Sequence, residues 1–141
     1  MDMEAQISFG SVSVGQEIGP IEIPITLQRL VMEAGANRDF SLIHHDRDVA
    51  QATGAADAYM NTFFIAGMFE RLLREWMGPR GFLNKIGDLR MSAFNVVGDV
   101  VKFSARVTGI REDSSQVELE LEACNDAGTT VSATALVTLP P

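Results

Sequence analysis

The sequence predicts an α+β domain in which a curved antiparallel sheet wraps around one long central helix. Helical periodicity dominates residues 26–77, whereas apolar and polar residues alternate from about Phe82 onward. The most hydrophobic helical segment is 62–77, with Asn61 as a good N-cap and a Gly-Pro pair as a strong stop signal. Its first two turns are apolar on every side, so this helix must be surrounded by other structure.

Residues 21–36 predict a short strand followed by an amphipathic helix. Isoleucines at alternate positions mark the strand, and Pro24 lacks an N–H, which favours an edge of the sheet. Thr26 is a suitable N-cap for the helix, and Gly35 is a suitable stop. Between them the apolar residues recur at helical spacing: Leu27, Leu30, Val31 and Ala34.

Three further segments complete the first half of the chain. Residues 36–45 match neither the helical nor the strand period and predict a loop. Asp46 can cap a two-turn helix that ends at Gly54. Residues 1–15 predict a loose leader.

The second half predicts an antiparallel sheet. The strands with regularly alternating apolar residues are 101–107, 117–123 and 131–139. Such alternation is typical of a sheet with one buried and one solvated face. Turn residues at 112–115 and 125–128 suit hairpins, and a further strand is expected within 82–93, without a clear register.

Composition and charge narrow the class of protein. The 141 residues predict a single domain over 1–141, since a domain spans roughly 100–200 residues. The formal charge of −8 argues against nucleic-acid binding, which needs a basic surface. The longest apolar run, 63–69, is far shorter than the roughly 20 residues of a membrane helix. The single Cys124 and the acidic first residues lead us to expect a cytoplasmic protein without disulfides.

The residues best suited to chemistry are Asp39 and His44, in the predicted loop. Held five residues apart, they could meet on one water as an acid–base pair; the alternative is that they are ordinary turn and surface residues. At the start of the central helix, the N–H groups of Thr62 and Phe63 have no intrahelical acceptor. They could stabilise an oxygen that gains negative charge, or simply meet the Asn61 side chain and water.

Several short motifs between residues 15 and 78 carry a family resemblance. Asp39, His44 and Asp46 match a pattern of an aspartate, a short apolar step, His, one residue and Asp before a central helix. This pattern resembles the MaoC-like (R)-specific enoyl-CoA hydratases of the hotdog fold. The small hydratase subunits of bacterial steroid side-chain degradation are similar in further motifs: Arg38-Asp39-Phe40, His44-His45-Asp46-Arg47-Asp48, Asn61 and Trp76-Met77-Gly78-Pro79.

Two positions depart from the general pattern of that family. Ser41-Leu42 stands where MaoC-like sequences usually have Asn-Pro, and Asn61-Thr62 stands where they usually have His-Gly. The steroid-type subunits also depart there, so the differences indicate the subfamily. A threonine in place of glycine crowds the approach of a thioester to the helix start.

The resemblance implies a hotdog-fold hydratase that adds water to C3 of a trans-2-enoyl-CoA. Asp39 and His44 would act on the water, and the Thr62 amide, helped by the Asn61 side chain, would bind the thioester oxygen. The resemblance also implies no cofactor beyond the CoA of the substrate, and a homodimer or a heteromer with a second, non-catalytic hotdog subunit. Two alternatives stay open: a non-catalytic acyl-CoA-binding hotdog subunit and a hotdog thioesterase.

Further expectations concern the surroundings of this site. Four apolar residues are expected to line a pocket for a bulky, sterol-like acyl group: Phe40, Met60, Phe63 and Phe64. Six basic residues within 80–111 could form a lip for the CoA phosphates, or be the solvated faces of two strands. We expect no metal site, because the adjacent His44 and His45 point in opposite directions in an extended loop. Nothing near Cys124 in the sequence would lower its thiol pKa.

Overall fold

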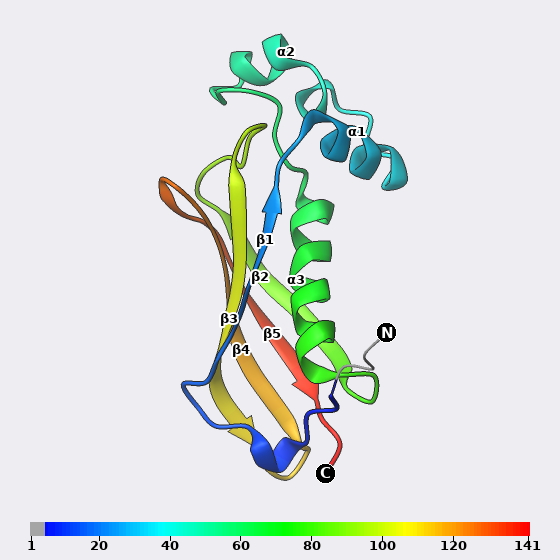
Figure 1. The fold of residues 1–141 in the computed structure, drawn as a ribbon, viewed down its shortest axis with the longest axis vertical. Helices are drawn as coiled ribbons and strands as arrows, with labels where there is room; N and C mark the ends of the chain where they lie inside the picture. The colour runs from blue at the N-terminus through cyan, green and yellow to red at the C-terminus, as the bar shows by residue number, and fades with distance from the viewer. Residues whose placement is uncertain (1–4) are drawn as a thin grey trace.

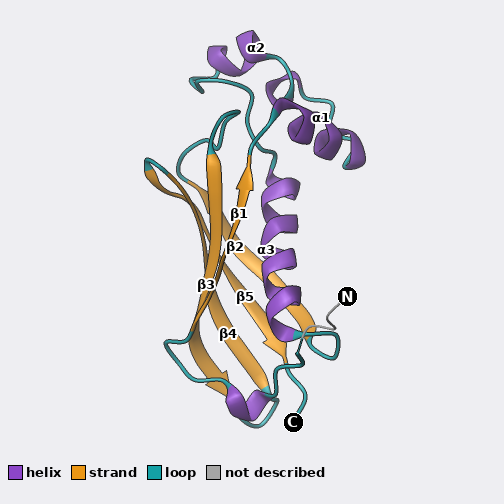
Figure 2. Ribbon diagram, viewed as in Figure 1, coloured by secondary structure: helices purple, strands orange, loops and turns teal. Residues whose placement is uncertain are grey.

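A five-stranded antiparallel sheet curves around one long helix in the computed structural model, which describes residues 5–141 (Figure 1, Figure 2). The sheet order is β1-β3-β4-β5-β2. The strands are β1 (Glu17–Pro24), β2 (Phe82–Met91), β3 (Val100–Arg111), β4 (Gln116–Asn125) and β5 (Gly128–Thr138). The helices are α1 (Leu27–Ala36), α2 (Arg47–Ala52) and α3 (Thr62–Met77). The predicted α+β arrangement, a curved sheet around a central helix, is confirmed.

The hydrophobic core lies between α3 and the inner face of the sheet. Alternate residues of β3, β4 and β5 are buried, as the period-two pattern predicts. Phe69 of α3 is fully buried and packs edge-on against Phe103 of β3, with ring centroids 5.2 Å apart. The buried residues of α3 are Phe64, Ile65, Met68, Phe69, Leu72, Leu73 and Met77. This packing fixes where α3 begins relative to the sheet.

The sheet covers only one side of α3. Phe63, in the first turn, is 62% exposed, and Gly67, one turn later, is also exposed. The expectation that the first two turns are enclosed on every side is therefore wrong for the single chain. The physical reason is that the sheet ends at β2, which leaves the neighbouring side of the helix uncovered (Figure 1).

Both short helices begin at their predicted caps. The Thr26 hydroxyl accepts a backbone N–H of α1 at 3.1 Å, and the Asp46 carboxylate accepts one of α2 at 3.2 Å. Helix α1 continues through Gly35 to Ala36, because the left-handed turn that ends it comes at Arg38 (φ 55). None of the helices in residues 5–141 is long and apolar enough to cross a membrane.

Two segments pack differently from their sequence patterns. Leu27 and Val31 of α1 are each 47% exposed, because α1 lies beyond the end of the sheet and only part of its apolar stripe meets the core (Figure 1). The leader that we expect to be loose is packed where the structure describes it. The Phe9 N–H donates to the Pro140 carbonyl at 2.8 Å, and Val12 is buried. The first four residues of that leader lie outside the described residues.

Strands β1 and β2 form the two edges of the sheet. Pro24 ends β1, so the prediction of an edge strand there is confirmed. The strand expected within 82–93 is β2, and its pairing with β5 shifts register at two places, which explains the absence of a clear sequence pattern. An edge strand presents a row of unpaired backbone groups. On β2 that row lies beside the uncovered side of α3 (Figure 1).

Truncating Phe69 tests this description of the core. Phe69→Ala removes a fully buried ring and is expected to lower the free energy of unfolding by about 3–5 kcal/mol. Val14→Ala, at a side chain that is 62% exposed, is the control and is expected to change it by less than about 0.5 kcal/mol. Urea unfolding followed by circular dichroism measures both, and similar small losses for the two variants would contradict the packing described.

Candidate active site

Asp39 and His44 meet in the loop that follows α1. After the left-handed turn at Arg38, the Asp39 N–H donates to the Ala34 carbonyl at 2.8 Å. A short 3₁₀ turn, Leu42–His44, then places His44 Nε2 3.0 Å from Asp39 Oδ2. The His44 side chain is 6% exposed and that of Asp39 is 29% exposed. The loop therefore joins the two predicted residues, with Asp39 as the more accessible partner.

The backbone around His44 determines which ring nitrogen carries a hydrogen. His44 Nδ1 lies 2.7 Å from the Tyr59 carbonyl oxygen, which can only accept, so Nδ1 must donate. Nε2 then faces the Asp39 carboxylate, where two lone pairs would repel unless a proton lies between them. The geometry therefore describes an Asp39–His44 pair that shares one proton in addition to the hydrogen on Nδ1.

Tyr59 is held in place by a small second core. It is 8% exposed and packs with Ala50 of α2 and with Ala55. Its ring meets the His44 ring edge to face at 5.7 Å, and its hydroxyl lies 3.3 Å from Thr53 Oγ1. Helix α2 thus fixes the carbonyl that orients His44. Nothing in the sequence pattern pointed to Tyr59, because its contribution is a backbone oxygen.

Asn61 connects the Asp39–His44 pair to the start of α3. Its Oδ1 accepts the Phe64 N–H at 2.7 Å, which confirms the predicted N-cap. Its Nδ2 donates to Asp39 Oδ2 at 3.3 Å. The residue is 5% exposed. We expect the Asn61 amide to help bind a thioester oxygen, but both its oxygen and its nitrogen already have hydrogen-bond partners within the chain.

The first two N–H groups of α3 have no acceptor within residues 5–141. The capping oxygen of Asn61 takes the N–H of Phe64 and leaves those of Thr62 and Phe63. Thr62 and Phe63 are exposed residues, and their N–H groups lie at the positive end of the helix dipole. The Thr62 hydroxyl points to Met91 Sδ of β2 at 3.9 Å, which makes Met91 a neighbour that the sequence did not single out.

The four residues expected to line an acyl pocket divide into two pairs. Phe40 is 76% exposed and Phe63 is 62% exposed, so both present apolar surface to a ligand or a partner. Met60 and Phe64 instead lie in the main core, at 1% and 7% exposure. Met60 precedes the N-cap and Phe64 lies on the buried side of α3, so both belong to the core and not to an open pocket.

Other candidate residues have structural roles or lie apart from the Asp39–His44 pair. His45 is exposed, and Asp46 caps α2. The described chain brings together no group of three or more His, Cys, Asp or Glu side chains suited to a metal ion. Three of the six basic residues expected as a phosphate lip are paired with acids of neighbouring strands: Lys102 with Glu22, Arg106 with Glu120 and Arg111 with Glu118.

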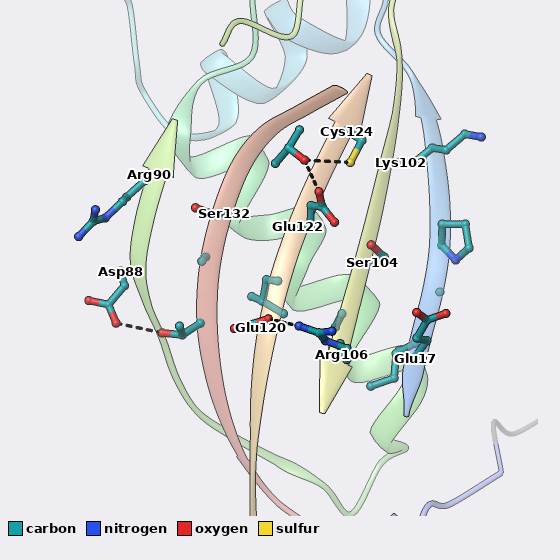
Figure 3. A pocket seen from close by; sticks show the side chains of 18 residues that line it. Glu17, Asp88, Arg90, Lys102, Ser104, Arg106, Glu120, Glu122, Cys124 and Ser132 are labelled. Atoms are coloured by element: carbon teal, nitrogen blue, oxygen red, sulfur yellow. Dashed lines mark hydrogen bonds and ion pairs between the residues drawn. The ribbon is translucent and has the colours of Figure 1, made fainter. Parts of the chain in front are cut away.

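A hollow lies on the outer face of the sheet, with α3 behind it (Figure 3). It has a volume of about 990 Å³, and the Arg106–Glu120 pair and Cys124 line it. Burial, followed by the interaction with Glu122, raises the pKa of the Cys124 thiol, which disfavours a reactive thiolate. Neither Asp39 nor His44 lines this hollow, so it is separate from the candidate site.

Comparison with known proteins places the chain in a family. No family model matches it. It is 34% identical over 105 residues to the 3-oxo-4,17-pregnadiene-20-carboxyl-CoA hydratase beta subunit of Mycobacterium tuberculosis, a match that covers 74% of this chain and 79% of that protein. This degree of identity over most of both chains is enough to show that the two proteins belong to the same family.

Solved structures agree with that match. The chain superposes on one from the ChsH1–ChsH2 complex of Mycobacterium tuberculosis with a TM-score of 0.84 and 30% identity, covering 90% of this chain and 98% of that chain. An (R)-hydratase from A. caviae involved in PHA biosynthesis superposes with a TM-score of 0.84 and 25% identity, covering 92% of this chain and 98% of that chain. The chain therefore belongs to the MaoC-like (R)-hydratase family of the hotdog fold.

Proposed function

We propose that this protein adds water across the 2,3 double bond of an enoyl-CoA thioester, with Asp39 and His44 as its acid–base pair. The 3.0 Å contact between their side chains, beside the two unshared N–H groups at the start of α3, is the observation that carries this proposal. A steroid side-chain enoyl-CoA is the substrate class, by analogy with the named substrate of the hydratase relative. The reaction needs no cofactor beyond the CoA of the substrate.

Asp39 is the partner that meets the water, since it is the more exposed of the two. Its Oδ2 already faces His44 Nε2 and Asn61 Nδ2, whereas its Oδ1 accepts, among residues 5–141, only the Ser41 N–H, at 3.3 Å. Oδ1 therefore retains a lone pair for a proton from the water. As the water oxygen bonds to C3, Asp39 takes that proton and the pair returns one proton to C2. The pair carries one shared proton before and after the reaction.

The thioester oxygen becomes enolate-like as the water adds to C3. The N–H groups of Thr62 and Phe63 are suited to bind it, because they belong to exposed residues, lack acceptors among residues 5–141 and lie at a helix N-terminus. A preorganised donor of this kind commonly lowers the barrier by about 3–4 kcal/mol.

The site is completed by a second hotdog subunit that covers the open side of α3. A groove of about 620 Å³ lies there, lined by Phe63 and Gly67 of α3 and by Leu83 and Ile86 of the edge strand β2. An exposed phenylalanine beside an unpaired strand edge is suited to association. The relative is a beta subunit and a similar chain is part of a complex, which supports a heteromer as well as a homodimer.

Substitution of either member of the pair tests the proposed chemistry. Asp39→Asn and His44→Ala are each expected to reduce hydration of an enoyl-CoA by at least about 100-fold, the lower range for general acid–base catalysis. The loss of enoyl absorbance is followed with the CoA still attached, using short-chain and steroid esters, with and without a candidate partner subunit.

His45→Gln is the matched control, because His45 is exposed and its side chain is not among the hydrogen-bond or ion-pair partners of Asp39 and His44 in residues 5–141. Its rate is expected to stay near that of the unaltered protein. Release of free thiol would indicate a thioesterase instead, and saturable acyl-CoA binding without turnover would indicate a passive subunit. Near-normal hydration by either variant of the pair would exclude the assignment.

A charge on the open side of α3 tests the proposed association. Phe63→Arg is expected to abolish the dimer or heteromer that the unaltered chain forms, because a desolvated arginine would face the partner. Light scattering coupled to gel filtration measures the mass, alone and with a candidate partner. Val14→Arg, at an equally exposed residue that precedes β1, is the control. A chain that stays monomeric in both conditions would contradict the proposal.

A further inference from the structure

We propose that Asn61 is a positioning residue that acts through Asp39, and not a direct ligand of the thioester oxygen. This inference rests on the proposed function. It assigns one side chain two tasks: it holds the acid–base pair, and it leaves the first N–H groups of α3 free for the substrate.

The orientation of the Asn61 amide follows from its partners. A backbone N–H only donates, so the atom that faces the Phe64 N–H at 2.7 Å must be the amide oxygen. The amide nitrogen then points the other way, to Asp39 Oδ2 at 3.3 Å. Because Asn61 is only 5% exposed, bulk water offers little alternative to either partner.

This donor fixes which oxygen of Asp39 faces the reaction. Oδ2 lies between His44 Nε2 and Asn61 Nδ2, so both of its lone-pair directions are occupied. Without the Asn61 N–H, the carboxylate would be held only by His44 on Oδ2 and by the 3.3 Å bond from the Ser41 N–H on Oδ1. It could then rotate more freely about χ2, a torsion with a broad energy profile. Oδ1 would then be oriented less precisely for the attacking water of the proposed reaction.

The same amide ties the pair to the oxyanion donors. Asn61 takes the N–H of Phe64 and leaves those of Thr62 and Phe63 without an acceptor in residues 5–141. A capping side chain that is also bonded to Asp39 therefore holds the acid–base pair at a set distance from the two free donors. A displacement of about 1 Å in such an arrangement can cost roughly 100-fold in rate.

Asn61→Ser separates the two tasks. Serine caps helices as well as asparagine does, but its short side chain has no amide N–H to offer Asp39. We expect kcat to fall at least about tenfold, with KM changed less than about threefold, since only orientation is lost. Thr26→Ala, which removes the cap of α1, is the control for lost stability and is expected to keep kcat within about twofold.

A double-mutant cycle with Asp39→Asn decides whether Asn61 acts through Asp39. Single-turnover rates with excess enzyme are measured for both single variants and for the double variant. If Asn61 acts through Asp39, adding Asn61→Ser to Asp39→Asn changes the rate by less than about twofold. If Asn61 binds the thioester oxygen directly, the two losses multiply, and the inference is overturned while the proposed function stands.

Two further outcomes are also decisive. Full activity in Asp39→Asn would overturn the proposed function itself, because no acid–base pair would then be required. If Asn61→Ser does not fold, Asn61→Asp replaces it, since aspartate keeps the capping oxygen and nearly the same shape. A second carboxylate beside Asp39 is expected to lower kcat at least as much, and unchanged kcat in that variant would refute the inference.

Discussion

The start of α3 is the constraint on which the rest of the site depends. The first N–H groups of a helix have no intrahelical acceptor, and at this end of α3 the loop that carries Asp39, 22 residues earlier in the chain, comes within hydrogen-bond distance. Asn61 takes one of those N–H groups and bonds Asp39 with the same amide. The packing of α3 against the sheet, centred on Phe69 and Phe103, sets where these groups lie. Fold and site are thus joined at one residue.

Features that depend on local chemistry were predictable from the sequence. The caps at Thr26, Asp46 and Asn61 each depend on a side chain a few residues from the N–H that it accepts. The inward residues of β3, β4 and β5 follow from alternation, since one face of the sheet is buried. The contact of Asp39 with His44 involves only six consecutive residues and a tight turn, so it could be predicted from the local sequence.

Features that depend on tertiary contacts were not predictable. The Tyr59 carbonyl orients His44 from 15 residues away. Every residue type has such a backbone oxygen, so the identity of the residue does not indicate this role. The second bond of Asn61 crosses 22 residues. The apolar first turns of α3 suggest complete enclosure, yet the sheet stops at β2 and exposes Phe63. An apolar pattern predicts that a side chain is buried, but it does not indicate whether the same chain or a partner chain buries it.

The proton on Nδ1 of His44 is the most direct test of the account, because it decides which nitrogen faces Asp39. The measurement is the ¹⁵N NMR spectrum of the imidazole in His45→Gln, which leaves His44 as the single histidine. The account predicts a hydrogen bonded to Nδ1 in both the neutral and the charged ring, with the Nε2 signal changing in Asp39→Asn. A neutral ring with its hydrogen on Nε2 and a bare Nδ1 would contradict the geometry from which the mechanism is derived.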